Sequence, residues 1–400
     1  MLFAEIKAVK GVRNDVGPER FATGDLRYGR NIDIDETGKA FRRRGVTTVQ
    51  AGAAHSGWSD GTQALFVQGG VLKRMTPDGV IAAVSPSVTI TGTRVSFVQI
   101  NGRVYWADGV SRGVVTGGQN APWGITPPPK LQPTVGGGNL PAGRYLCTMT
   151  YVSDDGSESG APPETLVQAS TTGGIQFSDL PVSAEPGVVR KNIYVSPADT
   201  STPMLVGTIS NASTTFSLTE FPDSVASLRT ALMQPAPVGG QLLGYYNGRA
   251  YVGIDKFLCY SQPFEYSLFD PRDFLAFDSF VQTFAAVRDG IFVGTKTRTV
   301  FLSGSEPSGF ISRPISPYGT VLGTETVVPS AYLVDNEDNA ALGNTSVLWT
   351  SVKGVVLGSD GGVTRDLTAA RYIPPAATTG AALIKRRDGT TPQYLVSLAS

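Results

Sequence analysis

Short runs of apolar, β-branched and aromatic residues recur along the whole chain, and turns rich in glycine separate them. The clearest runs lie at 63–68, 95–100, 241–246, 299–304 and 346–351. Such runs are typical of β-strands, whereas apolar positions with helical spacing are scarce. The pattern predicts an all-β protein with one short helix after Asp223, where Val225, Leu228 and Leu232 would share a face.

Turns containing glycine join many of these runs, and their Asn-Gly and Asp-Gly pairs favour two-residue hairpin turns. The glycines concerned are Gly38, Gly70, Gly102, Gly248, Gly290 and Gly354. Their spacings are 32, 32, 146, 42 and 64 residues, and removing an insert of about 108 residues brings the third spacing to about 38. Hairpins that repeat every ~30–40 residues are typical of propeller blades with about four strands each. We therefore expect a β-propeller-like body.

Proline-rich segments at 125–133 and 234–240 mark the ends of the insert. Between them, strand-like runs lie at 144–152, 165–170, 174–178, 189–196, 204–209 and 214–218. About 100 residues with this strand spacing fit a β-sandwich of the immunoglobulin or fibronectin-III type, and the missing Cys…Trp…Cys pattern favours the fibronectin-III version. The expected domains are 1–127 as the first body segment, 128–235 as the inserted sandwich and 236–400 as the second body segment.

The last hairpin, at 381–398, has no neighbouring strands of its own in the sequence. Pairing with an N-terminal strand at 2–9 would close the propeller ring and remove exposed strand edges. We expect the two body segments to meet in this way around the insert.

The chain is electrically balanced, with 33 basic and 33 acidic residues, and only 16% of its residues are charged. The predicted insert has a net charge of −4 and the remainder has +4. Neither part has the large basic excess of a protein that binds nucleic acid tightly. Low charge and abundant apolar residues instead suit large subunit interfaces.

Two cysteines, Cys147 and Cys259, lie in different predicted domains, which excludes a disulfide framework and a cysteine metal cluster. We expect both to be buried thiols in a reducing compartment. Glu5 and Lys7 interrupt the apolar run that a secretion signal needs, and no stretch of about 18 apolar residues is present. We expect a soluble protein without a membrane span that is made in the cytoplasm.

Motifs for catalysis or metal binding are incomplete. The segment 57–61 (GWSDG) matches the G-x-S-x-G nucleophile elbow, but the only histidine, His55, precedes it instead of following it. Two acidic segments, 33–38 and 335–339, lack the terminal glutamate of a calcium loop and are interpreted as turns. The sequence predicts no catalytic residue, no cofactor site and no metal site, so we do not expect an enzyme.

Two basic runs supply the candidate contact residues of the chain. They are Arg42, Arg43 and Arg44, and Lys385, Arg386 and Arg387. Side chains alternate between the two faces of a strand, so each triplet offers one or two cations to either face. A solvated strand edge is the simpler interpretation, since charges there discourage aggregation. The functional interpretation is contact with nucleic acid or with an acidic neighbouring subunit.

Three segments carry a family resemblance. They are 11–15 (GVRND) with 31–45, 260–271 (YSQPFEYSLFDP), and 289–294 (DGIFVG) with 301–304 (FLSG). Together they resemble the tail nozzle (tail hub) proteins of short-tailed bacteriophages. The matches lie in both body segments and so cover most of the chain, whereas the insert fits less specifically.

The resemblance implies a virion tail protein, made in the host cytoplasm, that forms a homohexameric ring below the portal and adaptor. Such a ring continues the DNA channel, helps to retain packaged double-stranded DNA without reading its sequence, and docks tail fibres or spikes. The near-neutral charge fits a conduit through which DNA must slide.

Two alternatives stay open. One is a carbohydrate-binding or carbohydrate-cleaving propeller in which Trp58, Trp106, Trp123 and Trp349 stack on sugars, although such aromatic residues are more often part of a blade core. The other is a head-completion plug of the same virion layer that docks no fibre.

Overall fold

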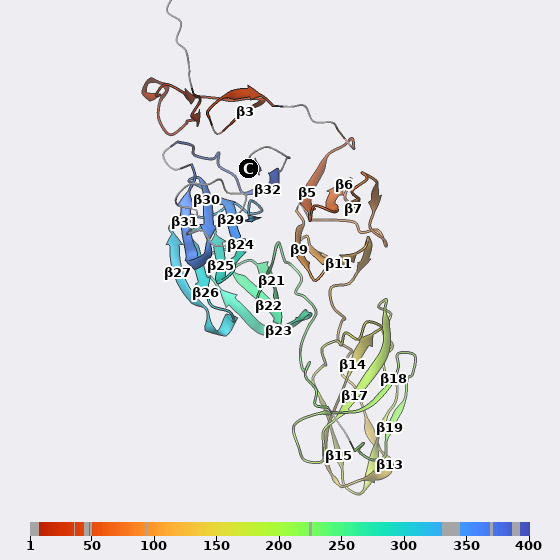
Figure 1. Cartoon of the computed structure of the whole chain (residues 1–400). Helices are drawn as coiled ribbons and strands as arrows, with labels where there is room; N and C mark the ends of the chain where they lie inside the picture. The colour runs from red at the N-terminus through yellow and green to blue at the C-terminus, as the bar shows by residue number, and fades with distance from the viewer. Residues whose placement is uncertain are drawn as a thin grey trace, which may run out of the picture.

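The computed structural model describes residues 8–35, 37–43, 48, 50–92, 94–223, 226–329, 345–368, 371–385 and 393–400. In these ranges the chain forms β-strands and three single-turn 3-10 helices, which are η1 (Pro18–Arg20), η2 (Pro307–Gly309) and η5 (Asp360–Gly362). None of the helices in the described part has the length and apolar character needed to span a membrane. The all-β prediction is confirmed. Figure 1 shows an N-terminal arm at one end, a body of small sheets in the middle and a separate sandwich at the other end.

The body contains five four-stranded antiparallel sheets, each built from four strands that are consecutive in the sequence (Figure 1). Such sheets are the blades of a propeller. Two precede the sandwich: blade 1 with β5 (Ala54–Ser59), β6 (Ala64–Gln68), β7 (Val71–Met75) and β8 (Ile81–Ala83), and blade 2 with β9 (Ser96–Ile100), β10 (Arg103–Ala107), β11 (Arg112–Thr116) and β12 (Gln119–Ala121).

The remaining blades follow the sandwich in the sequence. They are blade 3 with β20 (Leu242–Tyr246), β21 (Arg249–Ile254), β22 (Phe257–Gln262) and β23 (Glu265–Ala276), blade 4 with β24 (Val281–Val287), β25 (Gly290–Thr295), β26 (Thr299–Ser303) and β27 (Ile311–Ser316), and blade 5 with β28 (Thr326–Pro329), β29 (Thr345–Thr350), β30 (Val355–Ser359) and β31 (Val363–Asp366). A two-stranded sheet of β32 (Thr379–Lys385) and β33 (Gln393–Ala399) comes last.

Hydrophobic clusters join each blade to the next. Because side chains alternate across a strand, one strand serves two interfaces. In β10, Val104 and Trp106 pack in the cluster shared with blade 1, whereas Tyr105 and Ala107 pack in the cluster shared with blade 3. Similar clusters link blades 3 and 4, blades 4 and 5, and blade 5 with β32 and β33. Both faces of the central strands are covered, which explains their near-continuous apolar sequences and confirms the propeller-like architecture.

The glycine turns have two different positions within the blades. Three of them lie at or beside the turn between the first and second strands, in blades 2, 3 and 4, and two lie between the second and third strands, in blades 1 and 5. The sixth, Gly38, joins two strands of the arm. The two equal spacings of 32 residues therefore compare turns of different kinds and do not measure a blade repeat.

Residues 8–43 form the arm and are not part of a blade. The arm contains a parallel pair, β1 (Gly11–Val12) and β2 (Asp25–Leu26), and a hairpin, β3 (Ile32–Ile34) and β4 (Ala40–Arg42). Apart from Gly24, no residue that the structure describes in the arm is buried, so this part has no hydrophobic core of its own. The ring closure predicted for residues 2–9 lies mostly outside the described residues. Within them, Val9 bonds to another part of the arm, because its backbone N–H donates to the Gly38 carbonyl at 2.7 Å.

The insert is a β-sandwich of two sheets. One sheet has the order β13 (Thr134–Leu140), β16 (Gly173–Phe177), β19 (Phe216–Leu218), and the other has the order β15 (Thr165–Ala169), β14 (Gly143–Ser153), β17 (Val188–Val195), β18 (Met204–Ser210). A core that includes Tyr145, Met149 and Ile193 lies between them. The Tyr145 hydroxyl donates to the Pro141 carbonyl at 2.5 Å and so fastens the start of β14 to the preceding turn. A relation to immunoglobulin or fibronectin-III domains stays a prediction.

The short helix predicted after Asp223 is wrong for the part that the structure describes. Residues 226–232 are not helical and run beside the sandwich. The backbone N–H of Leu228, for example, donates to Pro203 at 2.9 Å. Pairing with neighbouring chain segments satisfies the backbone here, and this outweighs the weak helical spacing of the apolar residues.

The sandwich leaves the body between blades 2 and 3 without separating them. Trp123, before the sandwich, donates its indole N–H to the Tyr266 carbonyl of blade 3 at 2.8 Å. After the sandwich, Gln234 and Phe269 exchange two backbone hydrogen bonds of 2.8 Å. Both junctions are thus fastened to β23, so the insert starts and ends at one place on the body.

Candidate functional site

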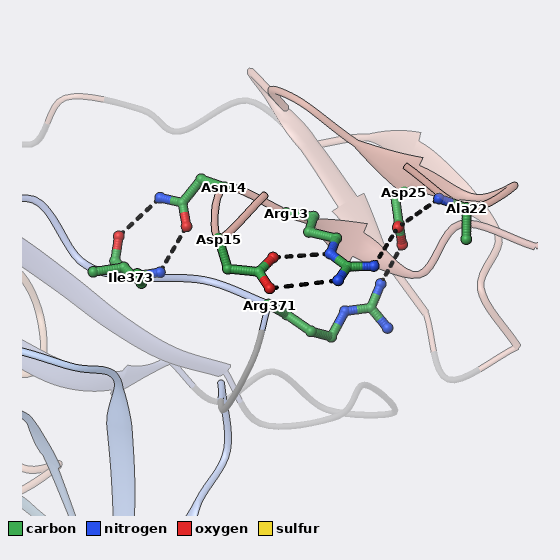
Figure 2. Close-up of polar contacts among 7 residues, drawn as sticks. All are labelled: Arg13, Asn14, Asp15, Ala22, Asp25, Arg371 and Ile373. Atoms are coloured by element: carbon green, nitrogen blue, oxygen red, sulfur yellow. Dashed lines mark hydrogen bonds and ion pairs between the residues drawn. The ribbon is translucent and has the colours of Figure 1, made fainter. Parts of the chain in front are cut away.

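The segment 11–15, which carries part of the family resemblance, fastens the arm to the body (Figure 2). The Asn14 side-chain oxygen accepts the backbone N–H of Ile373 at 2.7 Å, and its amide nitrogen donates to the carbonyl of the same residue at 2.8 Å. The backbone N–H of Asn14 also donates to the Arg371 carbonyl at 2.8 Å. Asn14 therefore satisfies both backbone groups of Ile373, as a neighbouring strand would.

Charged side chains lie to one side of this contact, and the Asp25 carboxylate binds the largest number of groups among them (Figure 2). It accepts the Ala22 backbone N–H at 3.0 Å, Arg13 Nη1 at 3.3 Å and Arg371 Nη2 at 2.5 Å. Arg13 Nε also donates to Asp15 at 2.8 Å. The Asp25 side chain is only 1% exposed. We name the set of Arg13, Asn14, Asp15, Asp25, Arg371 and Ile373 the arm clasp.

Both carboxylates of the arm clasp have pKa values below the ordinary aspartate range. For Asp25, the hydrogen bond from the Ala22 backbone N–H lowers the pKa most, and Arg13 and Arg371 lower it further. For Asp15, the hydrogen bond from Arg13 is the main cause. The same two acids raise the pKa of Arg13. Both carboxylates of the arm clasp are therefore ionised at neutral pH.

Local backbone geometry places these groups together. The parallel pairing of β1 with β2 sets Gly11 beside Asp25, and the Arg13 backbone N–H donates to Leu26 at 2.8 Å. Gly24, just before Asp25, has a φ of 95° and lies so close to Ala8 that an added Cβ would be 2.4 Å from its carbonyl oxygen. Only glycine fits this turn. Sequence reasoning missed Arg371 and Ile373, because no local pattern marks residues so distant in the sequence.

The candidate basic residues are only partly placed by the structure. Arg42 is exposed at the end of β4, and Arg43 donates from Nε to Asp33 at 2.8 Å. Lys385, at the end of β32, has Nζ 3.5 Å from Gln393 Oε1. The other candidates, Arg44, Arg386 and Arg387, lie outside the described residues. The two runs belong to different sheets, one in the arm and one in the last hairpin.

A cavity of about 1050 Å³ lies where the first strands of the blades meet. Side chains from β5, β9, β20, β24, β28 and β32 line it: Trp58, Phe97, Tyr245, Phe284, Val327 and Leu383. Arg94 Nη1 donates to the Gln241 carbonyl at 2.8 Å, and its Nη2 lies 3.9 Å from Glu325 Oε1. Burial raises the pKa of Glu325, while Arg94 opposes the rise. Arg94 thus connects the starts of blades 2, 3 and 5, a role that no sequence motif indicated.

The remaining motifs form ordinary turns. In the 57–61 segment, the Ser59 hydroxyl donates to the Gln63 carbonyl at 2.7 Å, and Asp60 accepts the Thr62 N–H at 2.8 Å. Asp35 accepts the Lys39 N–H at 2.9 Å. The first segment therefore contains the end of β5 and the turn after it, and the interpretation of 33–38 as a turn is confirmed between β3 and β4. The segment 335–339 lies outside the described residues. Across the described ranges, no three His, Cys, Asp or Glu side chains group together as a metal site would need.

The tryptophans and cysteines are mostly structural. Trp106, Trp123 and Trp349 are each 1% exposed, as expected for blade cores, and only Trp58 is half-buried beside the cavity. Cys147 is buried in the sandwich, and burial raises its pKa to about 12. The prediction of burial is wrong for Cys259, which is half-buried in β22 because it lies at the margin of the cluster between blades 2 and 3.

No family model and no curated protein matches the chain. Among solved structures, a crystal structure of BBS1N in complex with ARL6DN aligns over 85% of this chain and 85% of that chain, with 11% identity and a TM-score of 0.34. PorZ, a surface component of the type-IX secretion system of Porphyromonas gingivalis, aligns over 91% of this chain and 61% of its own, with 11% identity and a TM-score of 0.22. The computationally designed protein Ika8 aligns over 86% and 96%, with 9% identity and a TM-score of 0.26. At such low similarity, the fold assignment rests on the chain's own sheets.

Proposed function

We propose that the chain is a structural, non-enzymatic subunit of a bacteriophage tail, a nozzle or hub protein. In this role it forms a homohexameric ring in the virion, below the portal and adaptor. The ring continues the DNA channel, helps to retain packaged DNA and docks fibres or spikes. The observation that carries the proposal is the arm clasp, because the segment 11–15 that resembles nozzle proteins has a defined structural task in this fold.

The separation of the chain into three parts supports this role. The arm and the sandwich lie at opposite ends of the body (Figure 1). Each part exposes large apolar side chains, such as Tyr28 in the arm, Val182 in the sandwich and Ile311 in blade 4. A ring subunit must contact two neighbours and also the proteins above and outside the ring, so it needs several distinct surfaces.

In this proposal the ring of subunits encloses the DNA channel, and the propeller of a single chain does not. The central cavity of about 1050 Å³ is the size of a small-molecule pocket and is far too small for a duplex. Arg94 and Glu325 also connect different blades beside it. The cavity is therefore a packing feature of each subunit.

The location in the virion is tested with particles of the phage that encodes the chain. Mass spectrometry of purified virions should detect the protein, and antibodies against it should label the tail vertex. Particles made without the protein should lose their DNA and carry no fibres. Absence of the chain from purified particles would overturn the proposal. Particles that retain fibres but leak DNA would instead favour the head-completion plug.

The carbohydrate alternative loses support from the tryptophan positions. Three of the four indole rings are buried between blades and cannot stack on a sugar. A glycan array combined with a hydrolysis screen checks the remaining case, and clear sugar turnover would favour the enzyme over the tail subunit.

A further inference from the structure

The arm has a positive charge that its own acids do not neutralise. Residues 8–43 contain eight basic and six acidic residues. Asp15 and Asp25 are engaged in the arm clasp, and Asp33 lies 2.8 Å from Arg43. Asp35 accepts backbone N–H groups of its own turn. Most of the arm's carboxylates are therefore already bound by groups on the same chain.

Four arginines of the arm are exposed and form no ion pair or side-chain hydrogen bond with any residue that the structure describes. They are Arg20, Arg27, Arg30 and Arg42. Arg42 pairs with Ile32 at the open end of the β3–β4 hairpin. Arg30 is two residues before Ile32 in the sequence, so its backbone lies near that of Arg42. These four guanidinium groups are thus available to another molecule.

Three of these arginines, together with two neighbours, lie close to one another along the backbone of the arm. Tyr28, which is 70% exposed, lies between Arg27 and Arg30 in the sequence. The Arg43 backbone N–H donates to the Asn31 carbonyl at 2.9 Å, and its side chain remains 43% exposed. We name Arg27, Tyr28, Arg30, Arg42 and Arg43 the arginine edge.

We propose that the arginine edge contacts the phosphate backbone of double-stranded DNA without reading its sequence. A guanidinium group is always charged, and its planar donors match two phosphate oxygens. Tyrosine hydroxyls also donate to phosphate oxygens in protein–DNA interfaces. An exposed cationic segment with an aromatic residue among the arginines has the composition expected for such a contact.

A second copy of the chain is a poorer partner for this surface. The most acidic part is the insert, yet several of its carboxylates are engaged internally. Glu158 accepts from Asn192 and Tyr194, and Asp155 pairs with Arg103 at 3.3 Å. The density of negative charge that four cations require is found along a nucleic acid backbone.

The expected binding is weak and depends strongly on salt. Three or four phosphate contacts give a slope of roughly −3 to −4 in a plot of log affinity against log salt concentration. Such contacts dissociate readily, which suits DNA that must move. The inference deepens the proposed function by naming a surface that meets the DNA. Its test uses the purified chain, so it can fail while ring formation and virion location are upheld.

The test is fluorescence anisotropy of the full chain with labelled duplexes of two unrelated sequences over a range of salt concentrations. The arm variant is Arg27→Ala/Arg30→Ala/Arg42→Ala. The matched control is Arg190→Ala/Arg229→Ala/Lys256→Ala, which removes the same charge from exposed residues of the insert and blade 3. We expect the arm variant to bind roughly tenfold more weakly at low salt and to lower the slope by about 2 to 3, and the control to change neither.

A charge-preserving variant separates loss of contact from loss of folding. Arg27→Lys/Arg30→Lys/Arg42→Lys should regain most of the affinity, because lysine also binds phosphate as a point charge. The proposal is overturned if the natural chain does not bind duplexes at low salt, or if the arm and control variants weaken equally. It is also overturned if the arm variant loses binding to an acidic polypeptide but not to DNA, since the partner is then a protein.

Discussion

Single side chains hold the arm on the body, because the arm has no hydrophobic core. Asp25 is shared by Arg13 and Arg371, and Asn14 binds both backbone groups of Ile373. The sequence marked 11–15 only through its resemblance to nozzle proteins. No local pattern in the sequence indicates these partners, because they lie near the other end of the chain.

Asp25→Asn is expected to release the arm without unfolding the body. The amide keeps the shape of the side chain but removes the charge that holds both arginines. Trypsin should then cleave the arm several-fold faster than in the natural chain, as followed by mass spectrometry. Asp278→Asn, which affects an exposed pair with Arg298 at 3.2 Å, is the control and should leave the rate unchanged. Equal rates for Asp25→Asn and the natural chain would contradict the role of the arm clasp.

Acid should loosen the arm only at low pH. The pKa values of Asp15 and Asp25 are lowered from 3.8 in the folded protein. Their ionised forms therefore stabilise the docked arm fully above pH 3.8, and this stabilisation is lost as the pH falls through the lowered values. Hydrogen exchange of the Asn14 and Ile373 amides, corrected for intrinsic rates, should stay slow from neutral pH down to this limit. Loss of protection already near neutrality would show that other groups govern docking.

The two cysteines should differ sharply in reactivity. Burial raises the pKa of both thiols, to about 12 for Cys147, but Cys147 is fully buried and Cys259 is only half-buried. A thiol must be ionised and accessible to react. In native protein, the Cys259→Ser variant keeps only Cys147 and should therefore react very slowly with a thiol reagent. The Cys147→Ser variant keeps only Cys259 and should react faster. Both variants should react completely after unfolding, and fast labelling of native Cys259→Ser would argue against the packed sandwich.

Among the elements, apolar strands were predicted well and glycine-rich strands were not. The run 144–152 nearly coincides with β14, because its apolar and β-branched residues have high strand propensity. In contrast, β13 (TVGGGNL) was missed, since three adjacent glycines suggest a loop. Pairing with β16 brings Gly136 opposite Gly174, where the backbones approach closely. Tertiary pairing decides the structure of such a segment, and local sequence does not record it.

Gly323→Ala tests the junction of the blades around Arg94. Gly323 has a φ of 82°, and an added Cβ would lie 2.5 Å from Arg94 Nε and 2.5 Å from the Gly380 carbonyl oxygen. Backbone strain of about 1–2 kcal/mol and a steric cost of similar size should lower the free energy of unfolding by about 3 kcal/mol. Urea unfolding measures this change.

Gly239→Ala is the matched control for this substitution. Gly239 has a φ of 87° but only Ile254 within 4 Å, at an ordinary 3.6 Å. Only the strain of about 1–2 kcal/mol should appear there. Equal losses in the two variants would show that the contact between Gly323 and Arg94 has no special role.

The whole molecule combines a continuous body with two parts that project from it (Figure 1). Composition and strand periodicity were enough to predict an all-β, propeller-like body interrupted by an insert. They could not reveal that residues 8–43 form an arm, because that depends on polar contacts over long sequence distances. They also could not reveal the bonds of Trp123 and Gln234 to β23, which keep blades 2 and 3 together around the insert.

Electron microscopy of the purified chain at high concentration tests the central claim most directly. A tail nozzle subunit should form closed rings of six copies, with the propeller bodies around an opening wide enough for a duplex and the sandwiches projecting from the ring. A chain that remains a monomer at every concentration, and also beside its adaptor ring, would contradict the account.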